Sequence, residues 1–448
     1  MNWGMIGWGA GSFGTGTVYN ALALFGLFYL TTVVGLEPAL AGSLFFITKL
    51  YDAVSDPLMG MISDRTRHRL GKRRPYLLAG GVLLGLSFWL IFLIEPLSTT
   101  AVTVSIVVLA LLFHATAYTV FSVPYLAIPA EMTHDYDERT KMMSYRVLFL
   151  MLGVMLGSVG GPKLVALGGE GQAGYQLMAL VFAAVAAGAG CLAFFSTASH
   201  TRLTVGGTTA AEQTAGFADG LKLLLRNRPF LLLVAVKLLQ LAALASVLAS
   251  APYLFRFVLQ LSTADIGNYL LVFTLAGLVS IPLWRPVIDR MGKRNTYIIC
   301  VTLYALAIAT WVLWTATEPT WLIYARAVLI GVGSTGGLLC GQALLPDTME
   351  YGRLASGKDN AGAYSGIFTT TEKLAGALGP LVVGVALSAA GLVKGDVGAE
   401  AQPDSAITAV LWCASLLPAV LNLATIPVLL KYNLSKERLA ELRLAAER

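Results

Sequence analysis

Two acidic residues and one serine share a helical face in a segment that is otherwise apolar. Asp52, Ser55 and Asp56 stand at positions i, i+3 and i+4, so all three side chains project from one side of a helix. Pro57 follows directly, lacks a backbone donor and can free a carbonyl oxygen near position 53. Two carboxylates one turn apart repel each other at low dielectric, so one holds a proton or both share a cation. The pattern predicts a site for H+ or Na+, because hard cations prefer oxygen ligands; the alternative is that these side chains only hydrogen-bond neighbouring helices.

Two further charged residues lie where the chain is otherwise apolar and call for a partner. Lys373 is too far inside its run to reach the interface easily, and Asp56 is the anionic partner that we expect. The alternative is that Glu372 and Lys373 line a wet cytoplasmic vestibule. Arg146 can donate a planar fork to a hydroxylated or anionic substrate, or it can hold the end of its helix at phosphate head groups. Lys237, with Gln240 near it, and Arg326 are lone charges that can pair across helices or snorkel to the interface, and we do not assign them to the site.

These residues must be held by helices that cross a membrane. Of 448 residues, 56% are hydrophobic and only 12% are charged, with a mean hydropathy of +0.72. A spanning helix takes about 20 apolar residues, so the composition predicts a polytopic α-helical membrane protein and excludes a water-soluble fold. No signal peptide is expected, because the first residues lack a basic region and a small-residue cleavage site. Twelve apolar runs are predicted to span: 11–34, 39–62, 75–95, 100–124, 143–168, 175–198, 229–254, 265–287, 295–316, 320–345, 361–391 and 406–431.

The charges between the runs predict the topology. Lys and Arg gather at 65–74, 139–141, 222–228 and 285–294, and an excess of basic residues marks cytoplasmic loops. We therefore expect both termini in the cytoplasm of a bacterial cell, with the protein in the inner membrane. The predicted domains are a six-helix bundle over 1–198, a cytoplasmic linker over 199–228, a second bundle over 229–431 and a cytoplasmic tail over 432–448.

Two basic loops repeat one another at half the length of the chain. Asp64-Arg65 with Gly71-Lys72-Arg73-Arg74 corresponds to Asp289-Arg290 with Gly292-Lys293-Arg294. Such a repeat is typical of transporters built from two related halves, with the substrate at the midplane between them. No nucleophile and base have catalytic spacing, and the four cysteines and four histidines show no ligand spacing, so neither an enzyme nor a metal cofactor is expected. We expect no nucleic-acid partner, and a monomer, since nothing in the sequence calls for a dimer.

The chain resembles the glycoside-pentoside-hexuronide:cation symporter family of the major facilitator superfamily. The likeness rests on Tyr51-Asp52-Ala-Val-Ser55-Asp56-Pro57, Gly71-Lys72-Arg73-Arg74-Pro75, Val123-Pro124-Tyr125, Ser144-Tyr145-Arg146, Pro346-Asp347 with Tyr351-Gly352, and Glu372-Lys373. It implies the superfamily fold of two six-helix halves and symport of a sugar or glycoside with Na+ or H+. The cation ligands implied are Asp52, Ser55, Asp56 and Thr119, with Lys373 balancing charge; the substrate residues are Gly16, Tyr19, Asn20, Tyr118, Ser122, Tyr125, Arg146 and Thr369.

The sequence departs from this family at two places. The sugar-binding acids of the first and fourth helices of melibiose-type carriers fall at about Gly16 and Ser122 here. A galactoside is therefore not implied, although Tyr19, Asn20 and Arg146 can replace these acids in part. Lysophospholipid symporters also resemble the family, so a lysolipid or another amphiphile is the alternative substrate.

Overall fold

The computed structural model of the protein describes residues 3–96, 99–133, 135–169, 171–198, 227–314, 318–356, 361–395, 398, 401–434 and 441. Throughout these residues the regular elements are helices, as predicted. Ten helical stretches there are long and apolar enough to cross a membrane. The charged α2 (Pro38–Arg65) is not among the ten, and α11 (Thr263–Ala309) counts once although it breaks at Gly292. With α2 included and α11 counted as two helices, the described residues contain one long helix for each of the twelve predicted spans.

The first six spans follow the predicted runs, with longer ends. They are α1 (Trp3–Phe28) continued by η1 (Tyr29–Val33), α2, α3 (Arg74–Ile91), α4 (Thr100–Met132), α5 (Tyr136–Met155) continued by η2 (Leu156–Gly160) and α6 (Gly161–Leu167), and α7 (Gly171–Ser196). The first helix begins eight residues before the predicted start at 11, because its early glycines pack closely against other helices. A Cβ added at Gly9, for example, would lie 2.8 Å from the Cβ of Tyr145 on α5.

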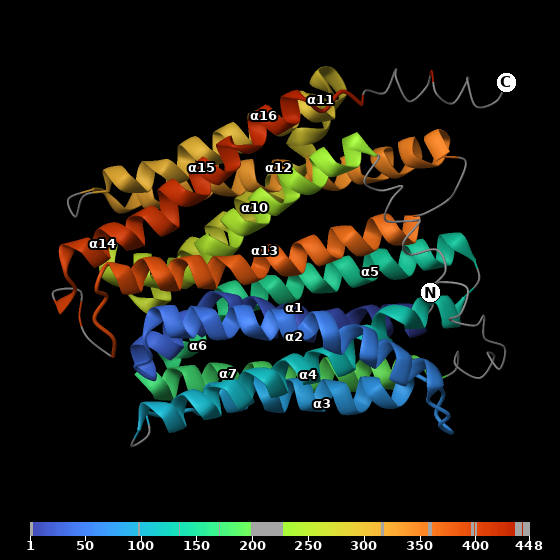
Figure 1. The fold of residues 1–448 in the computed structure, drawn as a ribbon, viewed down its shortest axis with the longest axis horizontal. Helices are drawn as coiled ribbons and strands as arrows, with labels where there is room; N and C mark the ends of the chain where they lie inside the picture. The colour runs from blue at the N-terminus through green and yellow to red at the C-terminus, as the bar shows by residue number, and fades with distance from the viewer. Residues whose placement is uncertain are drawn as a thin grey trace. The chain divides into compact units, whose positions relative to one another are not determined.

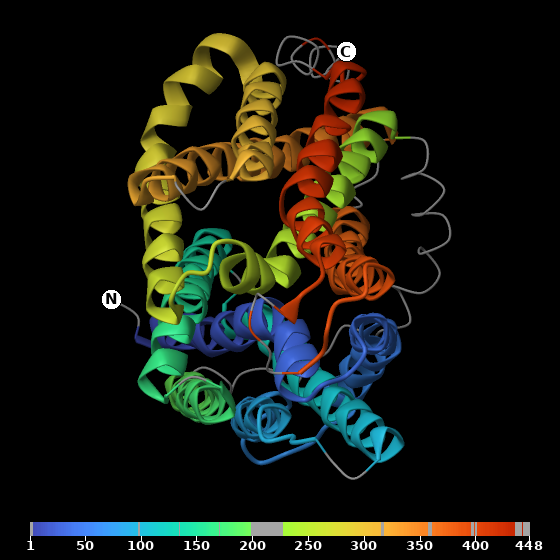
Figure 2. The ribbon, with the colours of Figure 1, turned by 90° about the vertical axis from the view of Figure 1, so that its left-hand side faces the viewer.

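The second six spans also follow the predicted order. They are α10 (Arg228–Tyr253) continued by η3 (Leu254–Val258), the two parts of α11 with η4 (Thr310–Leu313), α12 (Thr320–Ser356), α13 (Ala361–Ala389), and α14 (Asp404–Leu411) continued by η6 (Trp412–Leu416), α15 (Leu417–Leu423) and α16 (Thr425–Leu430). Gly292 has φ 78° and ψ 159°, and the chain of α11 turns sharply (Figure 2). The run at 361–391 forms one helix, α13.

Two compact units are formed by these helices. Unit 1 contains Met1–Gly207, Ala249–Leu271 and Pro380–Ala409, and unit 2 contains Thr208–Leu248, Val272–Gly379 and Val410–Arg448. The predicted linker and tail lie almost wholly outside the described residues, and the predicted domain boundaries stay a prediction. In unit 1, α1 packs on α5 and α7, α3 on α4 and α7, and α2 on α4, so these helices run side by side (Figure 1).

Within unit 1, α2 and the last part of α13 make a close backbone contact. A Cβ added at Gly384 would lie 2.3 Å from the carbonyl oxygen of Pro38, and one at Gly42 would lie 2.4 Å from that of Pro380. Glu37 and Ser388 are hydrogen-bonded at the same end. Only glycine permits this approach, because any side chain would push the two helices apart.

Substitution of Gly384 by alanine is therefore expected to destabilise the protein. Overpacking a close contact costs about 1–3 kcal/mol, which lowers the melting temperature of the purified protein by a few degrees. Gly188 is the matched control, since a Cβ added there would meet no heavy atom within 4 Å. Equal melting temperatures for Gly384→Ala and Gly188→Ala would contradict the contact.

The two repeated loops adopt related structures. Gly71 has φ 98° and Gly292 has φ 78°, a backbone region that glycine enters at little cost. Arg73 lies 2.5 Å from Asp64 and 3.0 Å from Glu131 at the end of α4, while Lys293 lies 2.6 Å from Asp347 on α12. Each repeated loop thus pairs a cation with an acid of the fourth or tenth span, which accounts for the repeat.

Candidate cation and substrate site

Three of the four predicted cation ligands lie together in unit 1. The Thr119 hydroxyl on α4 donates to Asp56 Oδ1 on α2 over 2.8 Å, and the Ser55 hydroxyl lies 3.4 Å from the Thr119 hydroxyl. Their spacing places Ser55 and Asp56 on the face of α2 that packs against α4. The α2–α4 contact therefore presents one carboxylate and two hydroxyl groups side by side.

The fourth predicted ligand, Asp52, is held by a residue to which no role was assigned. Asp52 is 4% exposed, and the Lys49 ammonium lies 2.9 Å from its Oδ2. Its other oxygen, Oδ1, is buried and has no hydrogen-bond partner in the described structure. A buried oxygen without a donor is costly unless an ion or a donor comes to it. The i, i+3 spacing of Lys49 and Asp52 was the sequence signal for this pair.

Aromatic rings stand beside the Lys49–Asp52 pair. Lys49 Nζ lies 5.7 Å from the centroid of the Tyr19 ring, and the rings of Tyr19 and Tyr118 are 6.2 Å apart. Tyr19 is 44% exposed although it belongs to a spanning helix. Exposed aromatic faces near charged groups are surfaces on which an apolar face of a ligand can pack.

Arg146 and Ser122 have groups that remain open to a ligand. Arg146 Nε is buried and lacks a hydrogen-bond partner among the residues described. Ser122 is half-buried on α4. An unsatisfied guanidinium donor inside a spanning bundle fits a residue that meets substrate better than one that meets head groups.

Three other predicted substrate residues hold helices together instead. A Cβ added at Gly16 would lie 2.6 Å from the Leu150 carbonyl oxygen on α5, so this position closes a helix contact. The Asn20 amide donates to the Ser158 hydroxyl over 2.7 Å. The Tyr125 hydroxyl bonds to Ser12 and to the backbone of α1, and its ring stacks on Trp8 at 4.7 Å. Their engagement inside unit 1 does not support direct substrate contact, which stays a prediction.

The predicted residues of α13 belong to unit 2. Lys373 is half-buried there, and its pairing with Asp56 stays a prediction. The side chain of Thr369 lies outside the described residues.

Unit 2 has a polar centre that was not predicted. Lys237 Nζ on α10 lies 3.1 Å from Glu372 Oε1 on α13 and 4.7 Å from the centroid of the Phe368 ring. One turn further along α10, Gln240 Oε1 accepts a hydrogen bond from the Tyr297 hydroxyl over 2.5 Å. The signal available in the sequence was a pair of opposite charges near the middle of two apolar runs.

A second ion pair of unit 2 has a different character. Arg326 on α12 makes two contacts with Glu318, of 2.6 and 3.2 Å, and its guanidinium lies 4.8 Å from the Trp311 ring centroid. The side chains of Arg326 and Glu318 are 7% and 15% exposed, so both charges are enclosed. Two contacts between enclosed charges are typical of an ion pair that stabilises the fold. The position of this pair near the ends of the spanning helices agrees with that role.

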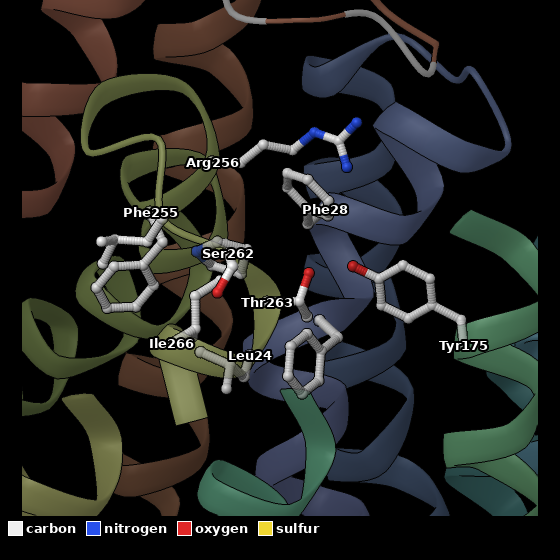
Figure 3. A pocket seen from close by; sticks show the side chains of 11 residues that line it. Leu24, Phe28, Tyr175, Phe255, Arg256, Ser262, Thr263 and Ile266 are labelled. Atoms are coloured by element: carbon white, nitrogen blue, oxygen red, sulfur yellow. The ribbon is translucent and has the colours of Figure 1, made fainter. Parts of the chain in front are cut away.

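A cavity of about 160 Å³ lies elsewhere in unit 1 (Figure 3). The first, sixth and seventh spans and the start of α11 form it, and the Tyr175 and Thr263 hydroxyls point toward one another across it, below Arg256. Nearby, the Thr31 and Tyr253 hydroxyls are 2.6 Å apart and join α1 to α10. The residues that line the cavity are Leu24, Phe25, Phe28, Tyr175, Pro252, Phe255, Arg256, Leu261, Ser262, Thr263 and Ile266.

The donor set around Asp56 suits some cations better than others. Among the described residues, no three His, Cys, Asp or Glu side chains gather where they could hold a metal ion. Carboxylate and hydroxyl oxygens are instead the groups that bind Na+, and a carboxylate with a hydroxyl neighbour also binds H+.

Known proteins resemble the chain over nearly its whole length. A putative glycoside/cation symporter of Escherichia coli is 26% identical, with 97% of this chain and 92% of that protein covered. The isoprimeverose transporter of Lactiplantibacillus pentosus is 24% identical, with 88% and 80% covered. The structure of a bacterial homologue of the human lysosomal transporter Spinster superposes with a TM-score of 0.66 at 13% identity, covering 99% of this chain and 96% of that one, and shows the same fold.

The family model described as MFS/sugar transport protein matches residues 7–436. Together with twelve spanning helices, this match confirms the fold and the class of protein that the sequence predicted. The chain belongs to the MFS/sugar transport protein family and is a multi-pass membrane transporter, not an enzyme.

Proposed function

We propose that the protein is a secondary symporter that moves a sugar or glycoside together with Na+ or H+. The observation that carries the proposal is the group of Ser55, Asp56 and Thr119. Helical spacing puts Asp52 on the same face of α2. Carboxylates at this depth in a bilayer are costly and mark ion pathways. The names of the glycoside/cation symporter and the isoprimeverose transporter support a sugar or glycoside as the substrate.

The geometry suggests how the cation and the protein share charge. In the described state the Lys49 ammonium neutralises Asp52, and the Thr119 hydroxyl satisfies one oxygen of Asp56. An arriving cation would bind Asp56 and the hydroxyl oxygens and would draw on the free Oδ1 of Asp52. A cation that binds one conformation more tightly than another shifts the protein between them, which couples its gradient to the substrate.

The substrate would meet the aromatic and guanidinium groups near this cation site. Tyr19 and Tyr118 offer ring faces, and Arg146 Nε offers a donor to a hydroxyl group. The names of the relatives support a sugar or glycoside over the amphiphile left open by the sequence. The location in a bacterial inner membrane, the cytoplasmic termini and a monomeric state are parts of the same proposal.

Uptake by proteoliposomes tests the proposal. An inward gradient of Na+ or of H+ is expected to drive accumulation of a radiolabelled glycoside above its external concentration, and an ionophore that collapses the gradient should stop it. The glycoside is chosen beforehand by thermal-shift screening of sugars, glycosides, uronides and lysolipids. Uptake that only equilibrates, whatever the gradient, would show a uniporter instead.

A further inference from the structure

The Lys237–Glu372 pair places two charges within spanning helices of unit 2. At 1.5 Å per residue, Lys237 lies about 14 Å from the first residue of α10, and Glu372 about 17 Å from the first residue of α13. The apolar span of α13 is Thr370–Ala389, so Glu372 stands in its first turn, while Lys237 stands in the third turn of the span Arg228–Val258. Charged side chains within spanning helices face the bundle interior or a water-filled cavity rather than lipid.

The two members of the pair are unequally exposed. The Lys237 side chain is 7% exposed and is enclosed by Glu372 and the Phe368 ring, whereas the Glu372 side chain is 42% exposed. The structural pair of Arg326 and Glu318 buries both charges and uses both carboxylate oxygens. Among the described residues, Lys237 contacts Oε1 of Glu372, and the exposure of this side chain leaves the rest of the carboxylate accessible.

A donor lies on the same side of α10 as Lys237. Gln240 follows Lys237 by three residues, which places both on one helical face. The Tyr297 hydroxyl bonds to Gln240 Oε1, so the amide nitrogen, which lies beside Gly337 of α12, is the remaining donor of that side chain. An ion-paired carboxylate accepts hydrogen bonds and an amide nitrogen donates them, the combination that a sugar hydroxyl can use.

We propose that Glu372 is a substrate-recognition residue of unit 2, where its carboxylate, held by Lys237, accepts a hydrogen bond from a hydroxyl group of the transported glycoside. Gln240 assists by donating to a neighbouring oxygen. The bound part of the substrate is then a neutral polyol surface, because an anion would be repelled by Glu372 and the charge of Glu372 is already balanced by Lys237. This inference rests on the proposed sugar transport and supplies an acid that the positions of Gly16 and Ser122 lack.

Deoxy analogues test the hydrogen bond directly. The probes are nitrophenyl hexosides and pentosides and, for the one that binds best, its set of monodeoxy analogues, titrated calorimetrically into purified protein. Wild type is expected to bind the parent about 10- to 100-fold more tightly than one of the analogues, the usual effect of a hydrogen bond to a charged group. In Glu372→Leu this preference should vanish, while the affinity for Na+ alone stays unchanged.

A double variant that removes both charges distinguishes a role of Glu372 in substrate recognition from a role in balancing the charge of Lys237. Lys237→Met combined with Glu372→Leu leaves no unpaired charge, so it remains testable even where Glu372→Leu alone fails to fold. Our inference expects this double variant to lack the preference for the parent, and the matched double variant Arg326→Met with Glu318→Leu to keep it. Restored preference in the Lys237–Glu372 double variant would overturn the inference and leave Glu372 as a counter-ion only.

The outcomes distinguish this inference from the proposed function. A preference that wild type shows and Glu372→Leu loses, without any effect of Na+ or H+ on binding, would contradict symport but support Glu372. Cation-dependent binding in which Glu372→Leu retains the preference would contradict Glu372 alone. A wild-type protein that binds none of the glycosides would contradict both.

Discussion

Replacing Asp56 by asparagine is expected to abolish cation-driven uptake while leaving the protein folded. The amide keeps an oxygen that the Thr119 hydroxyl can approach, but it has no negative charge with which to hold Na+ or a proton. The loss of one charge-assisted contact of about 3 kcal/mol reduces affinity about 100-fold, so driven uptake should fall to the background of empty liposomes. The measurement is initial uptake under an imposed gradient, with cation affinity from titration of the same preparation.

The control for this variant is another acid that is exposed and stands at a helix start. Asp404 begins α14, and Asp404→Asn is expected to transport like wild type. Thr119→Ala should give an intermediate loss, because it removes one neutral hydroxyl and keeps both carboxylates. Gradient-driven uptake by Asp56→Asn at the wild-type rate would refute the cation site.

Replacing Lys49 by methionine is expected to reduce net uptake of substrate while leaving the exchange of labelled for unlabelled substrate intact. Lys49 neutralises Asp52 in the described state, so a cation that uses Asp52 must compete with an ammonium group that is part of the chain. Without that competitor, Na+ affinity should rise about 10-fold, the factor that corresponds to about 1.4 kcal/mol. Net uptake should fall nevertheless, because the empty carrier must then change conformation with a buried, uncompensated carboxylate. Exchange of labelled for unlabelled substrate at saturating cation should persist, since the carrier is never empty.

Thermal stability gives a second measure of the same variant. Lys49→Met is expected to melt below wild type without Na+ and to recover when Na+ is added, because the ion then takes the place of the ammonium group. Lys49→Arg keeps the charge and should resemble wild type. The exposed Lys163 provides the control Lys163→Met, for which neither affinity nor melting temperature should change. An unaltered Na+ affinity in Lys49→Met would show that the Lys49–Asp52 pair does not compete with the ion.

The order of the spans was predictable because apolar length alone decides which segments cross a membrane. The charged face of α2 was also visible, since helical periodicity fixes which residues three and four apart share a side. The ends of the spans were less predictable. Helix α1 starts at Trp3 because its glycines pack against α5 and α7, and the helical periodicity of the sequence gives no signal of this contact. The break at Gly292 is likewise a backbone property, signalled in sequence only by its correspondence to Gly71.

The sequence by itself thus determined the membrane class, the twelve spans, the repeated loops and the carboxylate-bearing face of α2. Tertiary structure decided which partner each polar group takes: Thr119 for Asp56, Lys49 for Asp52, and Glu372 for Lys237. It also assigned Gly16, Asn20 and Tyr125 to helix contacts. The physical reason is that burial in a bilayer dictates the spans locally, residue by residue. The choice among possible partners depends instead on which helices pack together, and this is a property of the whole chain.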